Sequence, residues 1–382
     1  MQHTKVAVVG GGVLGTSIAA HLADTGAEVT LITRNGLGDG ASGRSLSWIN
    51  SFWTRNPAYH QLRLLGIDRY RTFSARHPQA DFLRFNGGLT WAAPGDPGHR
   101  EAYDYLRTVG YESHWLSADD ISSWTPGVDR DAIPAEGAIF NPGEGWIDLP
   151  SLIRHLAGKF SDSGGKVLES QGDAAVEVAN SKVTAIRTDA GRRLEVDSVV
   201  LATGPGVPAA ASAAGVHIPD GTTPALLVRT QPIAHPLQAV LNTPDVAVRR
   251  APNGSFVLDS AWSEAELTLG PDGAHHPRAD TVRRLLHAGS TVLEGNPQLE
   301  LDSVGIGLKP IPGDGEPVLG ALPGIEGYYV ALTHSGATLA LIVGELLADE
   351  VVTGVRYSLL DDFRPERFAA AKSVARIGAG GI

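Results

Sequence analysis

The sequence predicts a mixed α/β fold, in which a nucleotide-binding domain made of separate stretches of chain is interleaved with a second domain built on an antiparallel sheet. Segments of the nucleotide-binding type, a strand followed by a glycine turn and a helix, occur at the start, in the middle and at the end of the chain. The 382 residues also exceed one average domain of about 150 residues. The chain is therefore long enough for two or three domains.

The first segment of the chain has the pattern of a strand, a helix and a second strand. A continuous β-branched run at 5–9 is followed by apolar residues at helical spacing over 13–23 and by another apolar run at 29–32. This order predicts a βαβ unit, the core of a Rossmann-like domain.

The turn of this unit carries the pattern G-x-G-x-x-G at Gly10, Gly12 and Gly15, with Val13 and Leu14 inside it. The first glycine permits a tight turn, the second lets the backbone approach a pyrophosphate, and the third lets the helix pack closely on the strand. The position between strand and helix makes the motif specific, so we predict that these residues bind a dinucleotide.

The end of the second strand leaves the identity of the dinucleotide open. Such sites usually carry an acidic residue there for the ribose hydroxyls, but this chain has Thr33 followed by Arg34. Thr33 can bond a hydroxyl, and Arg34 can either accept a 2′-phosphate, as in NADP enzymes, or stack on adenine.

The rest of the chain alternates between the two predicted domains. Helices are expected at 57–76, 149–160, 279–293 and 337–350. Strands are expected at 198–202, 246–250, 255–259 and 328–332, and a small antiparallel meander over 166–196. We assign 1–85, 145–215 and 306–382 to the nucleotide-binding domain, and 86–144 and 216–305 to the substrate domain.

Composition excludes several classes of function. The chain has 31 Lys and Arg against 42 Asp and Glu, a net charge of −11 without a basic run, which disfavours nucleic acid and anionic membranes as partners. It contains no Cys, which excludes disulfides, thiolate metal sites and Cys nucleophiles. We see no metal motif, signal peptide or membrane anchor, and expect a cytoplasmic protein.

Four blocks of sequence, taken in order, resemble one known superfamily. They are the N-terminal βαβ unit, the loop GASGR at 40–44, the segment VVLATGPG at 199–206, and IGLKPIPGDGEPVLG with GYYVALTHSGATLALIVGELLADE near the end. Together they resemble the D-amino-acid oxidase, glycine oxidase and sarcosine oxidase superfamily of FAD-dependent amine oxidoreductases. The blocks are spread over most of the chain.

The resemblance implies roles for residues outside the glycine turn. The loop residues Ala41, Ser42, Gly43 and Arg44 match the segment that passes the pyrophosphate and the flavin. The remaining positions implied to contact FAD are Val176, Ala202, Thr203, Gly204, Gly336, Ala337, Thr338 and Leu339. The last four start a helix whose N-terminus would offer donors to the negative charge of a reduced flavin.

The substrate side departs from the family pattern. Lys309 stands where relatives commonly carry an Arg that clamps a carboxylate, and Thr338 stands where some hold a second cation. Lys309 can anchor a carboxylate, promote oxygen reduction, or pair with Asp314 or Glu316. Further candidates for the substrate pocket are Asn50, Trp53, His60, Arg249 and His334.

The resemblance implies FAD-dependent oxidation of a C–N single bond in an amino acid or secondary amine. A hydride would pass to flavin N5, water would hydrolyse the imine, and oxygen or an electron-transfer partner would reoxidise the flavin. Because the chain lacks Cys and the loop after Gly43 lacks His, we expect noncovalent FAD. An NADP-dependent dehydrogenase and a flavin-binding subunit without its own amine substrate remain alternatives, and the oligomeric state is open.

Overall fold

The computed structural model describes residues 4–53 and 55–368. Its first large sheet has six strands in the order β21-β22-β13-β1-β2-β9. These strands are β1 (Lys5–Val9), β2 (Glu28–Ile32), β9 (Lys166–Leu168), β13 (Ser198–Leu201), β21 (Val318–Ala321) and β22 (Tyr328–Leu332). All neighbours pair in parallel except β21, which is antiparallel to β22.

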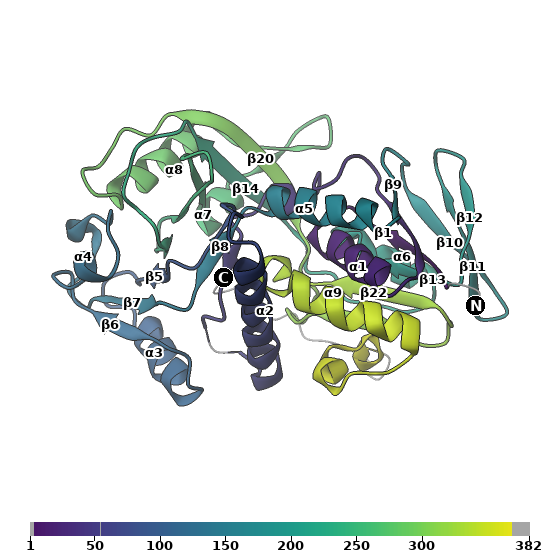
Figure 1. Ribbon diagram of the computed structural model, residues 1–382. Helices are drawn as coiled ribbons and strands as arrows, with labels where there is room; N and C mark the ends of the chain where they lie inside the picture. The colour runs from purple at the N-terminus through teal and green to yellow at the C-terminus, as the bar shows by residue number, and fades with distance from the viewer. Residues whose placement is uncertain (1–3, 54, 369–382) are drawn as a thin grey trace.

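Both faces of this sheet are covered, which explains why its strands are continuously apolar. In β1, Val6 and Val8 join one hydrophobic core while Ala7 and Val9 join another. The first core lies under four helices, α1 (Val13–Asp24), α2 (Pro57–Arg76), α5 (Leu149–Asp162) and α9 (Gly336–Thr353), of which α1, α5 and α9 run in front of the strands in Figure 1. The second core lies under α6 (Val207–Ala213) and a sheet of β10 (Ala174–Ala179), β11 (Lys182–Thr188) and β12 (Arg193–Glu195).

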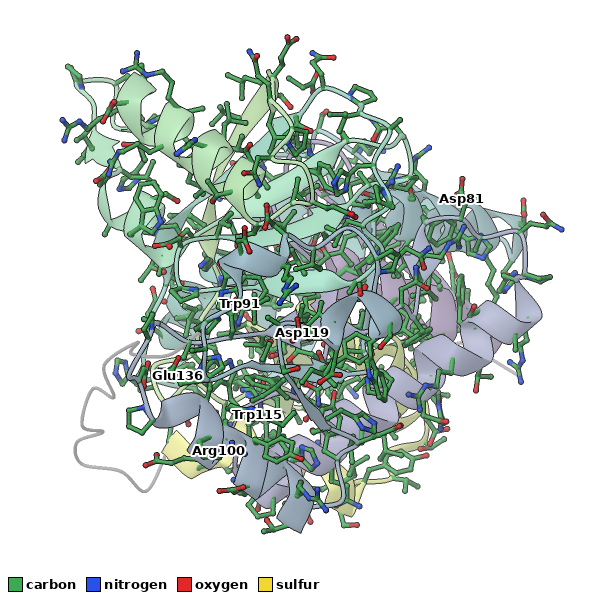
Figure 2. All side chains as sticks on the ribbon, turned by 90° about the vertical axis from the view of Figure 1, so that its left-hand side faces the viewer. Asp81, Trp91, Arg100, Trp115, Asp119 and Glu136 are labelled. Carbon is green, nitrogen blue, oxygen red and sulfur yellow. The ribbon has the colours of Figure 1, made fainter. Side chains whose placement is uncertain are left out.

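The second large sheet has eight strands in the order β20-β14-β17-β16-β15-β5-β7-β6. They are β5 (Gly88–Thr90), β6 (His114–Leu116), β7 (Ala138–Asn141), β14 (Thr223–Thr230), β15 (Val240–Asn242), β16 (Ala247–Arg250), β17 (Phe256–Asp259) and β20 (Leu301–Lys309). Its helices are α3 (Gly98–Thr108), α4 (Ile121–Trp124), α7 (Ala261–Ala265) and α8 (Ala279–Thr291). Figure 2 views the β6 end, where Arg100 of α3 stacks over the ring of Trp115 in β6 at 3.7 Å.

Two small sheets and five 3₁₀ helices lie between these elements in the described part of the chain. A three-stranded sheet is formed by β3 (Trp48–Ile49), β8 (Gly145–Ile147) and β4 (Leu83–Arg84), and a two-stranded one by β18 (Thr268–Leu269) and β19 (His275–His276). The 3₁₀ helices are η1 (Ala41–Gly43), η2 (Arg130–Ala132), η3 (Gly204–Gly206), η4 (Ser358–Phe363) and η5 (Pro365–Phe368). No helix among the described residues is long and apolar enough to span a bilayer.

The predicted mixed α/β fold is confirmed, with two local corrections. The sequence predicts the segment that begins at Lys166 as part of the meander, but this segment forms β9, which pairs in parallel with β2 in the large sheet. The meander starts only at β10. The second sheet is mixed, since β15 pairs in parallel with β5. The domain boundaries stay a prediction, part of which falls outside the described residues.

Candidate functional site

The glycine turn after β1 has no room for side chains. A Cβ on Gly10 would lie 2.3 Å from the Ala202 carbonyl oxygen, and one on Gly15 would lie 1.9 Å from the Gly10 carbonyl oxygen. Gly10 also has a φ of +119°, a conformation that L side chains rarely adopt. Strand β1, helix α1 and the end of β13 therefore meet through bare backbone, as a close approach to a dinucleotide requires.

The N-termini of α1 and α9 lie side by side above this turn. A Cβ on Gly336 would be 3.4 Å from Val13 Cγ1. Neither N-cap residue, Gly12 or Ser335, makes a side-chain cap hydrogen bond, and neither helix has an acidic residue in its first turn. Among the described residues, no acceptor takes the amides of Leu14 and Ala337. Two sets of oriented donors with partial positive charge are thus available to a large anionic ligand.

The loop after β2 closes over the start of α1. Ser42 Oγ accepts a hydrogen bond from the Val13 amide at 3.0 Å, and a Cβ on Gly12 would lie 3.2 Å from the same oxygen. Gly43 cannot carry a side chain, since its Cβ would meet the Gly38 carbonyl oxygen at 2.4 Å. Ala41 begins this 3₁₀ turn. The loop therefore needs a small residue at Gly43, where it meets Gly38 of the same loop, and Ser42 joins it to the start of α1.

Arg44 leaves the loop in the direction of the second sheet. Its guanidinium donates to the carbonyl oxygens of Asp39 and Gly40. Its methylene groups lie on β20, where a Cβ on Gly307 would be 3.0 Å from Arg44 Cδ. Arg44 therefore joins the two large sheets beside the predicted pyrophosphate loop.

The end of β2 is occupied by residues that already have partners. Thr33 is buried, and its hydroxyl donates to the Gly36 carbonyl oxygen at 3.2 Å. Arg34 forms an exposed ion pair with Asp173, whose Oδ1 accepts from Arg34 Nε at 2.7 Å. Their predicted contacts with the dinucleotide stay predictions.

The other predicted cofactor residues gather around the same turn or lie in elements next to it. The Ala202 amide donates to the Val9 carbonyl oxygen at 2.8 Å, and the Thr203 amide nitrogen would be 3.0 Å from a Cβ on Gly10. Gly204 follows with a φ of +57°. Val176 lies in the middle of β10, paired with Ile186.

In α9, Leu339 is fully buried and the side chain of Thr338 is engaged by the chain around β3. The Asn50 amide donates to Thr338 Oγ1 at 3.4 Å. The Thr338 hydroxyl therefore positions the β3 segment, and only the backbone at the start of α9 remains for a cofactor.

These features fit FAD. The glycine turn would hold the pyrophosphate against the N-terminus of α1, and the first turn of α9 would face the flavin ring. A Cβ at Gly10, Gly12 or Gly15 would fill this cradle or strike backbone. The fit to FAD rests on backbone groups of the glycine turn, whose positions the G-x-G-x-x-G pattern predicts.

Lys309 has a partner that the sequence did not predict. Its Nζ lies 2.7 Å from Glu264 Oε2, and not against Asp314 or Glu316, the two ion-pair partners that the sequence left open. Asp314 instead pairs with Arg367. Glu264 is on α7 and Lys309 ends β20, elements brought together by β14 pairing with β20 and packing on α7. The correction arises because strand pairing brings together residues that are far apart in sequence.

Arg249 is fully buried and mostly used by the protein itself. Its Nε donates to the Leu46 carbonyl oxygen and its Nη1 to the Arg250 carbonyl oxygen, while Nη2 lies 3.6 Å from Asp148 without a hydrogen bond. The side chain ties β16 to the loop after η1. A role as carboxylate anchor stays a prediction that only Nη2 could fulfil.

His334, the residue two before α9, is held neutral. Burial first, and then the charges of Lys309, Arg63 and Arg55, lower the pKa of His334 to about 3. A neutral imidazole can donate or accept one hydrogen bond but adds no charge. The positive charges that act on this imidazole are those of Lys309, which is paired with Glu264, and of Arg63 and Arg55.

A buried polar network fixes the segment between β3 and α2. Arg63 donates from Nε to the Asn50 carbonyl oxygen at 2.9 Å, from Nη2 to Asn50 Oδ1 at 2.8 Å, and from Nη1 to Ser335 Oγ. Tyr59 donates to the same Ser335 oxygen at 2.5 Å. Helix α2 is thereby linked directly to the residue that precedes α9.

A buried carboxyl lies at the other end of this segment. Glu144 accepts hydrogen bonds from Trp48 Nε1 at 2.8 Å and from the Tyr111 hydroxyl at 2.6 Å. Burial raises the pKa of Glu144 to about 8. The Tyr111 oxygen in turn accepts from the Ser51 amide at 3.0 Å, so one carboxyl orders three separate parts of the chain.

His60 and Trp53 are structural neighbours of the same network. His60 Nδ1 is 2.7 Å from Ser51 Oγ, and its Nε2 is buried without a partner among the described residues. Trp53 has a φ of 77° and makes edge contacts with the rings of Phe52 and His99. Asn50 and His60 therefore belong to one network with Arg63 and Glu144. Arg63 and Glu144 are not among the residues predicted from the sequence, because neither lies in a motif.

The site and the two-sheet fold define a class of FAD-dependent enzymes. Residues 5–350 match the family described as FAD dependent oxidoreductase, or DAO, so the chain belongs to this family. The assignment removes the ambiguity at Thr33 and Arg34 in favour of FAD and overturns the NADP-dependent alternative.

The chain is similar to several known proteins. Glycine oxidase of Geobacillus kaustophilus (strain HTA426) is 23% identical over 394 residues, covering 98% of each chain. The crystal structure of glycine oxidase from Geobacillus kaustophilus superposes with a TM-score of 0.81 at 19% identity, covering 97% of this chain and 100% of that one. The 4-methylaminobutanoate oxidase (formaldehyde-forming) of Paenarthrobacter nicotinovorans is 27% identical over 290 residues, which cover 72% of this chain and 33% of that one.

Proposed function

We propose that this FAD-dependent oxidoreductase oxidises the C–N single bond of a small amino acid or secondary amine. Family membership and similarity to a glycine oxidase and a 4-methylaminobutanoate oxidase support this proposal. The imine product would be hydrolysed by water to a carbonyl compound and an amine. Oxygen or another electron acceptor would complete the cycle.

The observation that carries the proposal is the set of cations near the start of α9. Arg63 donates to Ser335 Oγ, directly before α9, and Lys309 ends β20 with its Nζ 2.7 Å from Glu264 Oε2. Both, together with Arg55, also lower the pKa of His334. Positive charge attracts a carboxylate, and it also disfavours protonation of a nearby amine. A neutral amine has the free electron pair that hydride departure requires, so the same charges would both bind an amino acid and prepare it for oxidation.

The chain's own groups have distinct tasks in this scheme. When bound, FAD accepts the hydride that leaves the substrate carbon. The first turn of α9 offers backbone donors to the negative charge that oxidation of the substrate leaves behind. Lys309 would hold the substrate carboxylate, in exchange for its contact with Glu264 Oε2. His334 would line the pocket as a neutral group, and the network of Arg63 and Asn50 would keep the start of α9 in place.

Anaerobic mixing of the FAD-loaded protein with a substrate panel tests the proposal. The panel contains amino acids, N-methyl amino acids and other secondary amines, each with its 2-hydroxy acid or alcohol counterpart as the matched control. We expect loss of the visible flavin absorbance with at least one amine and no loss with its oxygen counterpart. The corresponding carbonyl product should accumulate in proportion.

Bleaching by hydroxy compounds alone, or by no member of the panel, would contradict the proposal. The second result would favour the alternative of a flavin-binding subunit, in which the Lys309–Glu264 pair closes the substrate site. Acid precipitation of the same preparation should release all FAD into the supernatant, because the chain has no Cys and no His in the loop after Gly43.

A further inference from the structure

A cavity of about 670 Å³ lies among the four helices that cover the large parallel sheet. Helices α1, α2, α5 and α9 all contribute to it. On α1 it reaches Ala20, seven residues after Val13, and on α9 it reaches Leu341, five residues after Gly336; at a rise of about 1.5 Å per residue these are about 10 and 8 Å from the two helix starts. None of the residues that line it belongs to the glycine turn or to the first turn of α9. It is therefore separate from the cradle that fits FAD.

Two of the four cations in the wall are already paired. Arg69 makes a bidentate contact with Glu345 at 2.5 and 2.9 Å. Lys159 lies 2.5 Å from Asp24 Oδ2. These pairs balance their own charges and leave the remaining cations to determine what the cavity attracts.

The other two cations have no carboxylate partner among the described residues. The guanidinium of Arg76, the last residue of α2, makes no hydrogen bond or ion pair there, and that of Arg154 in α5 donates only to the Ser151 hydroxyl at 3.0 Å. Asp162 is the one lining carboxylate without a cationic partner in the described chain. Two free guanidinium groups against one free carboxylate make this a cationic groove in a protein of net charge −11.

An aromatic cluster forms the adjoining wall. The ring of Phe73 lies 4.5 Å from that of His77 and 5.2 Å from that of His155, and the two imidazoles are 4.7 Å apart. Burial, and then the charges of His77 and Lys159, lower the pKa of His155 below its ordinary value. This imidazole is therefore neutral at physiological pH, and the wall offers an apolar, planar surface beside the two arginines.

We propose that this groove binds a small aromatic anion of the nucleoside monophosphate type. Its ring would pack on Phe73, His77 and His155. Its anionic group would accept hydrogen bonds from the free guanidinium groups of Arg76 and Arg154. Arginine pairs well with phosphate through two parallel N–H donors. The cavity volume lies within the range of about 300–1,000 Å³ that is usual for small-molecule sites.

Calorimetric titration of the FAD-loaded full chain, freed of unbound FAD, tests the site with three probes: AMP, adenosine and inorganic phosphate. We expect one AMP per chain, bound at least about tenfold more tightly than either fragment, a difference of about 1.4 kcal/mol. The visible flavin absorbance should not change during the titration, since the groove is remote from the flavin cradle.

The variant pair R76A and R154A should each weaken AMP binding at least about fivefold, and the double variant should remove it. H77A should reduce the affinity for adenosine and AMP but leave that for phosphate unchanged. R283A, which removes an exposed helical arginine from α8, is the matched control and should bind AMP as the wild type does. All four arginine and histidine side chains are exposed, so FAD content and circular dichroism should stay normal.

Four results would overturn the proposal. Absence of AMP binding by the wild type is the first, and AMP binding that survives in the double variant is the second. The third is release of FAD or a changed flavin spectrum as AMP binds, which would place the nucleotide in the cofactor cradle. Phosphate binding as tight as that of AMP would likewise contradict the role given to the aromatic wall.

Discussion

The glycine turn that starts α1 and the segment from β3 to α2 both support the start of α9, but they are built in opposite ways. The turn consists of backbone packed on backbone, where Gly15 excludes even a methyl group. The segment consists of buried polar side chains, with Arg63 and Glu144 as its centres. The first arrangement resembles that of many nucleotide sites, whereas the second depends on side chains that lie far apart in the sequence.

This difference predicts which region tolerates change. Backbone contacts cannot adjust when a side chain is added, because the neighbouring carbonyl oxygen has no other position. A side-chain network can lose one partner and keep the rest, at the cost of one unsatisfied group. Substitutions should therefore have all-or-none effects in the turn and graded effects in the network.

Gly15→Ala should have the largest effect. The new Cβ would lie 1.9 Å from the Gly10 carbonyl oxygen, so helix α1 must move away from β1. We expect the protein to lose FAD and to lose more than about 4 kcal/mol in its free energy of unfolding. Chemical denaturation and the absorbance of the purified protein measure both.

Gly158→Ala in α5 is the matched control. Nothing lies within 4 Å of its Cβ, so this helix-interior change should stabilise the protein by about 0.5–1 kcal/mol. If the two variants had equal FAD content and equal free energy of unfolding, the close contacts around Gly15 would not determine the effect of an added methyl group.

Glu144→Gln should have a smaller effect that depends on pH. The carboxyl has a pKa of about 8 in the folded protein against an ordinary value of 4.5, so the folded state holds more protons between these values. Wild-type stability should then fall as the pH rises towards 8, and the uncharged Gln variant should lose this slope.

The pH dependence of stability caused by Glu144 can be measured between pH 6.5 and 8. Below pH 6.5, the lowered pKa of His334 makes stability rise with pH and so opposes the effect of Glu144. Thermal denaturation at both ends of the window measures the slope, and Glu112→Gln on the surface is the control. At pH 6.5 we expect Glu144→Gln to cost about 1–3 kcal/mol, and an unchanged slope would exclude Glu144 as the titrating group.

The contrast also explains what the sequence could predict. The fixed spacing of Gly10, Gly12 and Gly15 predicts the geometry of their turn. Strands β1 and β22 and helix α2 begin and end where the sequence predicts. Arg63 and Glu144 are 81 positions apart and meet through the elements around Tyr111 and Asn50, a relation that no local pattern encodes. The Lys309–Glu264 pair escaped prediction for the same reason, since strand pairing brings it together.

The Lys309–Glu264 pair gives the third prediction. If Glu264 competes with a substrate carboxylate for Lys309, Glu264→Gln should lower KM for carboxylate-bearing substrates by about threefold or more, while Lys309→Ala should raise it about tenfold or more. Neutral amines are the control, and their KM should change little in both variants. Steady-state kinetics on the two substrate types measures the split, and equal effects on both types would remove Lys309 from the role of anchor.

Arg34→Ala should have the smallest effect. Arg34 and Asp173 are each 66% exposed, and such surface ion pairs are worth about 0–1 kcal/mol. Because the guanidinium is already bound to Asp173, we expect the FAD dissociation constant to change by less than about fivefold. Fluorescence titration of the apoprotein with FAD measures it, with Arg283→Ala as the control. A tenfold or greater loss of affinity for FAD at unchanged stability would mean that Arg34 leaves Asp173 to bind the cofactor. A side chain would then contribute to cofactor binding in a region where the glycine turn and the helix N-termini offer backbone groups.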